Sequence, residues 1–312
     1  MKTRTLIILA LLAVQLSTLA LAAADHGIMV RAAVVYLGPD STSDKLLSIE
    51  RGREIAIFER SGDYVHVLAT VSKPMQEDRD VSGWILNKGY VTASTPNGDQ
   101  ILYGEAVDSE NEASRRGGRK GAAGDARRLY YRVFEYFPNS PLAGEGLYRS
   151  ADIQWQLDRD DIESRPARKH LSNDRSEIEE DRMRLVMKKF PHTKWSDLAE
   201  FRLVENKLCG DWLGESRCPL REAEAYEKYA DSHPSSPAGS EAYYNAAVRY
   251  ASAIEIMKSE TNQKKIPEVT AKALDTAKRA IARNSSADWT ARAQALLFKI
   301  EHSVPVYGAQ VE

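Results

Sequence analysis

The first third of the chain contains short apolar runs in which hydrophobic and polar positions alternate with a period of two. Five such runs, rich in valine, isoleucine and aromatic residues, lie at 29–37, 45–49, 53–60, 63–71 and 82–86. Ile55 and Ile57 share one face of their run, as Val65 and Val67 do in theirs, which is the pattern of half-buried strands. Turn residues separate the runs. Five short strands joined by tight turns predict a small β-barrel that closes its own edges.

From about residue 97 the pattern changes, and apolar positions recur every three or four residues. That spacing predicts amphipathic helices, so the fold class is a multidomain all-β plus all-α chain. The expected helices span 100–115, 122–137, 142–157, 177–190, 195–208, 220–232, 239–256, 267–282 and 288–300. We therefore expect a β-domain at 25–96, a helical domain at 97–303 and a C-terminal tail at 304–312.

A proline-containing turn recurs within the helical part. Phe-Pro-Asn-Ser-Pro at Pro138, Phe-Pro-His-Thr at Pro191 and His-Pro-Ser-Ser-Pro at Pro234 are three matched copies, and a weaker copy without proline lies at 280–289. Eight and five positions before each proline, and ten and thirteen after it, the residue is apolar or aromatic. These offsets place one apolar face on each flanking helix.

The physical chemistry of these turns is consistent with a repeated helix–turn–helix unit. Proline ends the first helix because it disfavours the helical conformation for the preceding residue. A following serine or threonine is able to cap the second helix, and a second proline, at Pro141 or Pro237, suits its first turn. Units with one apolar face per helix must stack on their neighbours to bury it.

The N-terminal pattern resembles a bacterial SH3 domain. The matching residues are Gly38-Pro39, the strand 45–49, Gly52, Tyr64 to Val67, Gly83-Trp84-Ile85 and the closing Tyr90-Val91. The resemblance covers about 65 residues. It implies a small SH3-like β-barrel that binds cell-wall peptide or a protein segment.

The helical units resemble tetratricopeptide-like repeats. In style they are most similar to the repeat domain of outer-membrane-assembly lipoproteins, on Phe137-Pro138 with Ser140-Pro141 and on His233-Pro234 with Ser236-Pro237. The resemblance covers roughly 122–300. It implies a TPR-like α-helical superhelix that holds a protein partner on its concave face.

The first 24 residues predict a secretory signal peptide. Lys2 and Arg4 are followed by an uncharged apolar run at 6–21 and by three alanines at 22–24. An uncleaved membrane anchor is the alternative, because the apolar run nearly spans a bilayer, but the alanines favour cleavage. No cysteine lies near the cleavage region. We expect a periplasmic or otherwise exported bacterial envelope protein that is soluble, has no integral membrane segment after cleavage and is not lipid-anchored.

The charge and the cysteine content restrict which partners and which cellular compartment are expected. Without Lys2 and Arg4, the 43 basic side chains fall to 41 against 45 acidic ones, a net charge of −4. That balance argues against nucleic acid as a partner. Cys209 and Cys218 are the only cysteines, and in an exported protein they are expected to form one disulfide. A redox pair is the alternative, but such pairs usually have the closer Cys-x-x-Cys spacing.

No catalytic constellation is present in the sequence. No two of the six histidines fall at metal-ligand spacing on one helix, and the motifs of serine hydrolases, nucleotide-binding loops and dinucleotide folds are missing. We therefore expect a protein that is not an enzyme and uses no metal or cofactor. Its expected partners are envelope proteins, with peptidoglycan as an alternative ligand.

The aromatic residues are the candidate binding groups. Tyr36, Tyr64, Trp84 and Tyr90 are predicted to line a ligand groove of the barrel, although core packing is the favoured alternative for Trp84. Trp212 lies inside the expected disulfide loop, where an exposed indole is suited to anchoring a partner. Packing between repeats is the alternative role for tryptophans of the helical part.

Three functional hypotheses follow. The leading one is a non-enzymatic exported scaffold or adaptor, in which the barrel binds wall peptide or a protein segment and the helices bind a protein. The second is an outer-membrane protein assembly factor recruited through protein contacts. The third is a cell-wall hydrolase that uses carboxylates such as Asp160 and Glu163, although charged runs on helices are usually solvated faces.

Overall fold

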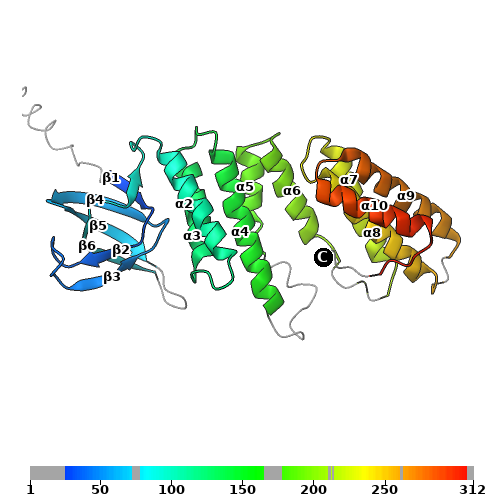
Figure 1. The fold of residues 1–312 in the computed structure, drawn as a ribbon, viewed down its shortest axis with the longest axis horizontal. Helices are drawn as coiled ribbons and strands as arrows, with labels where there is room; N and C mark the ends of the chain where they lie inside the picture. Colours follow the sequence, from blue (N-terminus) through cyan, green and yellow to red (C-terminus); the bar gives the residue numbers. More distant parts are fainter. Residues whose placement is uncertain are drawn as a thin grey trace, which may run out of the picture.

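The structure is a computed structural model, and it describes residues 25–71, 78–164, 178–209, 212, 214–260 and 263–307. The molecule is elongated, with a β-sheet at one end and a row of helices that extends away from it (Figure 1). The predicted signal peptide at 1–24 lies outside the described residues, as does the predicted tail beyond residue 307.

The β-part is an antiparallel sheet of seven described strands. They are β1 (Asp25–Met29), β2 (Ala33–Tyr36), β3 (Lys45–Ile49), β4 (Glu54–Ser61), β5 (Tyr64–Val71), β6 (Arg79–Leu86) and β7 (Tyr90–Thr92). Their order across the sheet is β3-β2-β6-β5-β4-β1-β7. The predicted alternation is confirmed on β4 and β5, because Ile55, Ile57, Val65 and Val67 are each at most 4% exposed.

The prediction of five strands is wrong. The five predicted runs correspond to β2 to β6, whereas β7 and all of β1 except Met29 lie outside them. β1 ends at Met29 because Val30 and Arg31 both donate their backbone N–H to the Gly89 carbonyl, at 2.9 and 3.2 Å, and the chain bends there. β1 begins before the predicted run and pairs with both β4 and β7. The apolar run, broken only by Arg31, carries no local signal for such a bend, since the acceptor lies far away in the sequence.

The nine predicted helices are all present in the described part of the chain. They are α2 (Gly98–Ala113), α3 (Ala122–Tyr136), α4 (Ala143–Ser164), α5 (Asp181–Lys189), α6 (Lys194–Asn206), α7 (Arg217–Ser232), α8 (Gly239–Met257), α9 (Ile266–Arg283) and α10 (Ala287–Glu301). α4 runs past the predicted end at residue 157, through a charged segment in which Arg159 pairs with Glu163 one turn later, at 3.6 Å.

Apolar contacts join the sheet to the first helices. Ile28 of β1 and Val91 of β7 share a buried cluster with Leu102 of α2 and Leu129 of α3. Beyond this junction each helix packs against the next one along the chain. The succession of buried clusters produces the row of helices seen in Figure 1.

The three proline turns have one backbone geometry. The residues before the prolines, Phe137, Phe190 and His233, have φ/ψ of −130°/60°, −129°/55° and −120°/68°. Each donates its N–H to the carbonyl four residues earlier. The positions eight and five residues before the prolines are at most 3% exposed in all three copies. The predicted repeat of the turn and of the first helical face is therefore confirmed.

The predicted cap of the second helix is confirmed in one of the three turns and differs in the other two. Thr193 caps α6 by accepting from the Ser196 N–H at 3.4 Å. Ser140 and Ser236 instead accept from the N–H two residues on, at 3.1 and 3.2 Å. Their hydroxyls therefore close the turn before the helix begins. Pro141 likewise precedes the first residue of α4, so the predicted place of the second proline inside the helical first turn is wrong.

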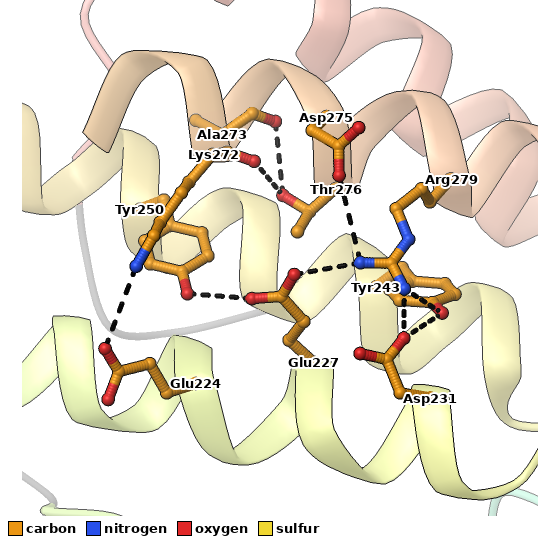
Figure 2. Close-up of polar contacts among 10 residues, drawn as sticks. All are labelled: Glu224, Glu227, Asp231, Tyr243, Tyr250, Lys272, Ala273, Asp275, Thr276 and Arg279. Atoms are coloured by element: carbon orange, nitrogen blue, oxygen red, sulfur yellow. Dashed lines mark hydrogen bonds and ion pairs between the residues drawn. The ribbon is translucent and has the colours of Figure 1, made fainter. Parts of the chain in front are cut away.

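A polar ladder connects α7, α8 and α9 (Figure 2). Arg279 of α9 donates to Glu227 of α7 at 2.9 Å and to the Tyr243 hydroxyl of α8 at 2.7 Å, and it pairs with Asp231. The Tyr250 hydroxyl donates to Glu227 at 2.9 Å. Because these groups satisfy one another, the ladder holds α9 beside α7.

Candidate functional site

The alternation of β5 and β6 places aromatic side chains on the outer face of the sheet. In register, Tyr64 lies opposite Leu86 and His66 lies opposite Trp84. The flanking residues Val65 and Ile85 are fully buried on the inner face. Since neighbouring positions of a strand point to opposite faces, Tyr64, His66 and Trp84 belong to the outer face.

Five rings follow one another across this face. Phe58 and His66 have ring centroids 5.9 Å apart, and His66 and Trp84 lie 5.1 Å apart. Trp84 is directly opposite Tyr36 of β2 in register, and Tyr36 meets the edge of Tyr64 at 6.1 Å. We call Phe58, His66, Trp84, Tyr36 and Tyr64 the aromatic face. Aromatic pairs at these separations attract one another beyond the area that they bury.

Exposed apolar side chains extend the aromatic face. Phe58 of this face is 55% exposed, and Val34 and Leu86, which share the outer face with Tyr36 and Tyr64, are 38% and 37% exposed. Next to Tyr36, Val34 and Leu86 line an open cavity of about 410 Å³. A soluble domain seldom leaves a contiguous apolar surface uncovered without a binding role. This surface is therefore the candidate binding site.

The turn beside this cavity carries a fixed negative charge. The hydroxyl and the N–H of Thr42 both donate to Asp40, at 2.6 and 2.9 Å, and the Ser43 N–H adds a third bond at 2.8 Å. The Thr42 side chain and backbone hold the pKa of the Asp40 carboxyl below its usual value. The 38–40 turn therefore presents an ionised carboxylate near the exposed Leu37.

Of the four aromatic residues of the β-part that were predicted to line a ligand groove, three lie together and the fourth does not. Tyr36, Tyr64 and Trp84 belong to the aromatic face, whereas Tyr90 of β7 packs against the sheet core. Core packing, the favoured alternative for Trp84, is wrong, because its side chain is half-buried and meets His66 in a tilted ring contact outside the core. The sequence-based prediction did not include Phe58 and His66. The alternation of apolar positions along their strands places both on the outer face and is the signal that indicates them.

Trp212 lies in the loop between α6 and α7 and is half-buried, so its predicted role as an anchor for a partner stays a prediction. Cys209 and Cys218 lie at disulfide-bonding distance, with Cα atoms 6.1 Å apart. The Trp212 indole N–H donates to the buried Glu222 at 3.2 Å, and the Cys209 N–H donates to the same carboxylate at 2.7 Å. These contacts direct the polar edge of the indole inward to α7.

The carboxylates considered for hydrolysis lie on the exposed surface of the described part of the chain. Asp160 and Glu163 are exposed on α4, and Glu163 pairs with Arg159. Within the described ranges, no three histidine, cysteine or acidic residues are grouped to hold a metal ion. No helix among the described residues is both long and apolar enough to cross a membrane.

Comparison with family models and with curated proteins found no match. The resemblances to bacterial SH3 domains and to tetratricopeptide-like repeats therefore remain predictions.

Proposed function

We propose that this chain is a non-enzymatic scaffold of the bacterial envelope, exported to the periplasm, whose sheet is an SH3-like barrel that binds a peptide of the cell wall or of a protein. The aromatic face is the observation that carries the proposal. Rigid rings offer a large apolar contact area at a low entropy cost, because each has only two side-chain torsions to fix. The cysteine pair is consistent with an oxidising compartment.

The helices would form a TPR-like superhelix that holds a second partner, a protein of the envelope. Two observations favour this role: the common geometry of the turns at Phe137, Phe190 and His233, and the packing of each helix on the next. Stacked repeats of this kind present extended surfaces to their partners. The chain would then connect the ligand of the sheet to the ligand of the helices.

The test is retention of the purified protein by sedimented peptidoglycan and capture of envelope proteins by the immobilised protein. Trp84→Ala should weaken the interaction of the sheet by about tenfold or more, the usual effect of removing a central aromatic contact. Tyr307→Ala is the matched control, because this exposed tyrosine lies at the other end of the described chain.

Two outcomes would contradict the proposal. One is a protein that retains neither wall material nor envelope protein. The other is equal retention by the wild type and Trp84→Ala, which would mean that the aromatic face takes no part. A clear lytic band in a zymogram of wall material would overturn the non-enzymatic role.

A further inference from the structure

A second cleft lies where the sheet meets the helices, and arginines surround it. Its volume is about 390 Å³. Arg31 comes from the bend between β1 and β2, Arg51 from the turn between β3 and β4, and Arg115 and Arg119 from the connection between α2 and α3. We call this the arginine cleft. Four guanidinium groups from three separate segments converge there.

The charge balance of the arginine cleft favours an anion. Its lining holds four arginines against two carboxylates, Asp108 and Glu112, while the whole chain has a net charge of −2. Two further carboxylates, Glu105 and Asp125, pair with these arginines but do not line the cleft. The positive excess is therefore confined to the surface that a ligand would meet. A concave surface lined mainly by one sign of charge concentrates ligands of the other sign.

The arginines are held in place and still have donors to offer. Glu105 accepts from Arg31 at 2.7 Å and from Arg51 at 3.3 Å, and the buried Asp125 pairs with Arg119 at 2.6 Å. A guanidinium carries five N–H donors, and each of these contacts uses one nitrogen. The carboxylates therefore orient the arginines without exhausting them.

An unsatisfied hydroxyl is the second, independent observation. Ser109 of α2 lines the cleft and is 1% exposed, and its Oγ has no hydrogen-bond partner among the described residues. A buried hydroxyl without a partner costs free energy. An acceptor from a ligand that reaches below the guanidinium groups would satisfy it.

We propose that the arginine cleft binds a ligand with two or more anionic oxygen groups, carboxylates or phosphates. Arginine suits this role because its planar fork matches both groups. Arg31 also lines the apolar cavity beside Tyr36, so the two clefts adjoin. The inference does not depend on the function proposed for the aromatic face, because none of the five aromatic-face residues lines the arginine cleft.

Calorimetric titration of the purified protein with citrate and, separately, with pyrophosphate tests this proposal and distinguishes the two anion chemistries. At least one of them should bind saturably with a Kd of about 1 mM or tighter. Arg31→Gln and Arg115→Gln should each weaken binding about tenfold, the effect of losing one charge-assisted hydrogen bond. Asp108→Asn should tighten binding, because it removes a competing negative charge from the lining, whereas Glu112 holds Arg115 at 3.3 Å and the Arg119 N–H at 3.0 Å.

Arg217→Gln is the matched control, since Arg217 is 89% exposed and lies outside the cleft. It should leave the affinity unchanged. The proposal is overturned if neither anion binds saturably, or if Arg217→Gln weakens binding as much as Arg31→Gln does. It is also overturned if Asp108→Asn weakens binding, because a negative charge in the lining would then favour the ligand. Melting temperatures of the variants separate loss of binding from loss of the fold.

Discussion

Glu222 of α7 and Arg249 of α8 form a buried ion pair, in which Arg249 Nε donates to Glu222 Oε2 at 2.8 Å while the side chains are 3% and 6% exposed. The same carboxylate accepts from the Cys209 N–H and from the Trp212 indole. The pair thus joins two helices to the disulfide loop. Burial of both charges is tolerated because their hydrogen bonds are satisfied.

Removing one member of this pair should be strongly destabilising. Arg249→Met would leave the Glu222 carboxylate buried without its counter-ion, and we expect the free energy of unfolding to fall by about 3–5 kcal/mol. Urea denaturation followed by tryptophan fluorescence measures the change. Arg217→Met, at an exposed position, should change stability by less than about 0.5 kcal/mol. If Arg249→Met lowers the free energy of unfolding no more than Arg217→Met does, the ion pair contributes little to stability.

The disulfide should stabilise the fold by constraining the unfolded chain. Cys209 and Cys218 are separated by nine positions, and closing so short a loop corresponds to roughly 2–3 kcal/mol on the chain-entropy model. The Cys209→Ser/Cys218→Ser double variant should therefore melt at a lower temperature. Reductant should lower the melting temperature of the wild type to a similar value and leave the double variant unchanged. Equal melting temperatures of oxidised and reduced wild type would contradict this expectation.

Two glycines with positive φ allow a paired test of the contact between the sheet and α3. Gly52 has φ of 73°, and a Cβ built there would lie 2.5 Å from Arg128 Cβ. Gly62 has φ of 55° with nothing within 4 Å. Gly62→Ala should cost about 1 kcal/mol through backbone conformation alone. Gly52→Ala should cost about 1–3 kcal/mol more, because the turn must move away from α3.

Chemical denaturation of the two glycine variants measures this difference. Both positions have positive φ, so alanine costs a similar backbone strain energy at each. The difference between the two losses of stability therefore measures the clash with Arg128. Equal losses of stability would show that the β3–β4 turn and α3 separate at little cost.

Glu241 should make stability depend on pH. Burial raises the pKa of its carboxyl to about 7, and the nearby Glu205 adds to the rise, while Arg202 and Arg292 oppose it. The folded state therefore binds a proton that the unfolded state releases near pH 4.5. Because the folded state holds more protons in this interval, stability falls as the pH rises from about 4.5 to 7, and the full penalty applies above pH 7.

Glu241→Gln removes this titration. The variant should be more stable than the wild type at pH 8, by on the order of 1–3 kcal/mol, and should gain much less at pH 4.5. Thermal melts at the two pH values compare the proteins. A variant whose advantage is the same at both values would show that the charge of Glu241 is not the cause.

The repeated proline turn is expected to be architectural. Pro138 and Pro141 restrict the unfolded chain and fit the turn between α3 and α4, so replacing both with alanine should cost about 1–2 kcal/mol in total. The melting temperature of the double variant is the measurement. Pro305→Ala, in the C-terminal extension, is a suitable control and should leave the melting temperature unchanged. An unchanged melting temperature for Pro138→Ala/Pro141→Ala would contradict the architectural role.

The sequence by itself was sufficient for the helices and for the first half of each proline turn, because the signals are local. Apolar spacing of three and four residues marks each amphipathic face, and proline acts on the residue next to it. The matched dihedral angles at Phe137, Phe190 and His233 therefore follow from the same short motif. The disulfide partner of Cys209 was equally predictable, since only one other cysteine exists.

Only the tertiary structure decided how the candidate sites are assembled. The bend that separates β1 from β2 depends on the distant Gly89 carbonyl. Trp84 joins His66 and Tyr36 on the outer face, and Tyr90 joins the core, because strand register selects their neighbours. The arginine cleft combines three segments that no local pattern connects. Periodicity indicates on which face of a strand or helix a side chain lies. Only the pairing of segments that are distant in the sequence determines which side chains meet on that face.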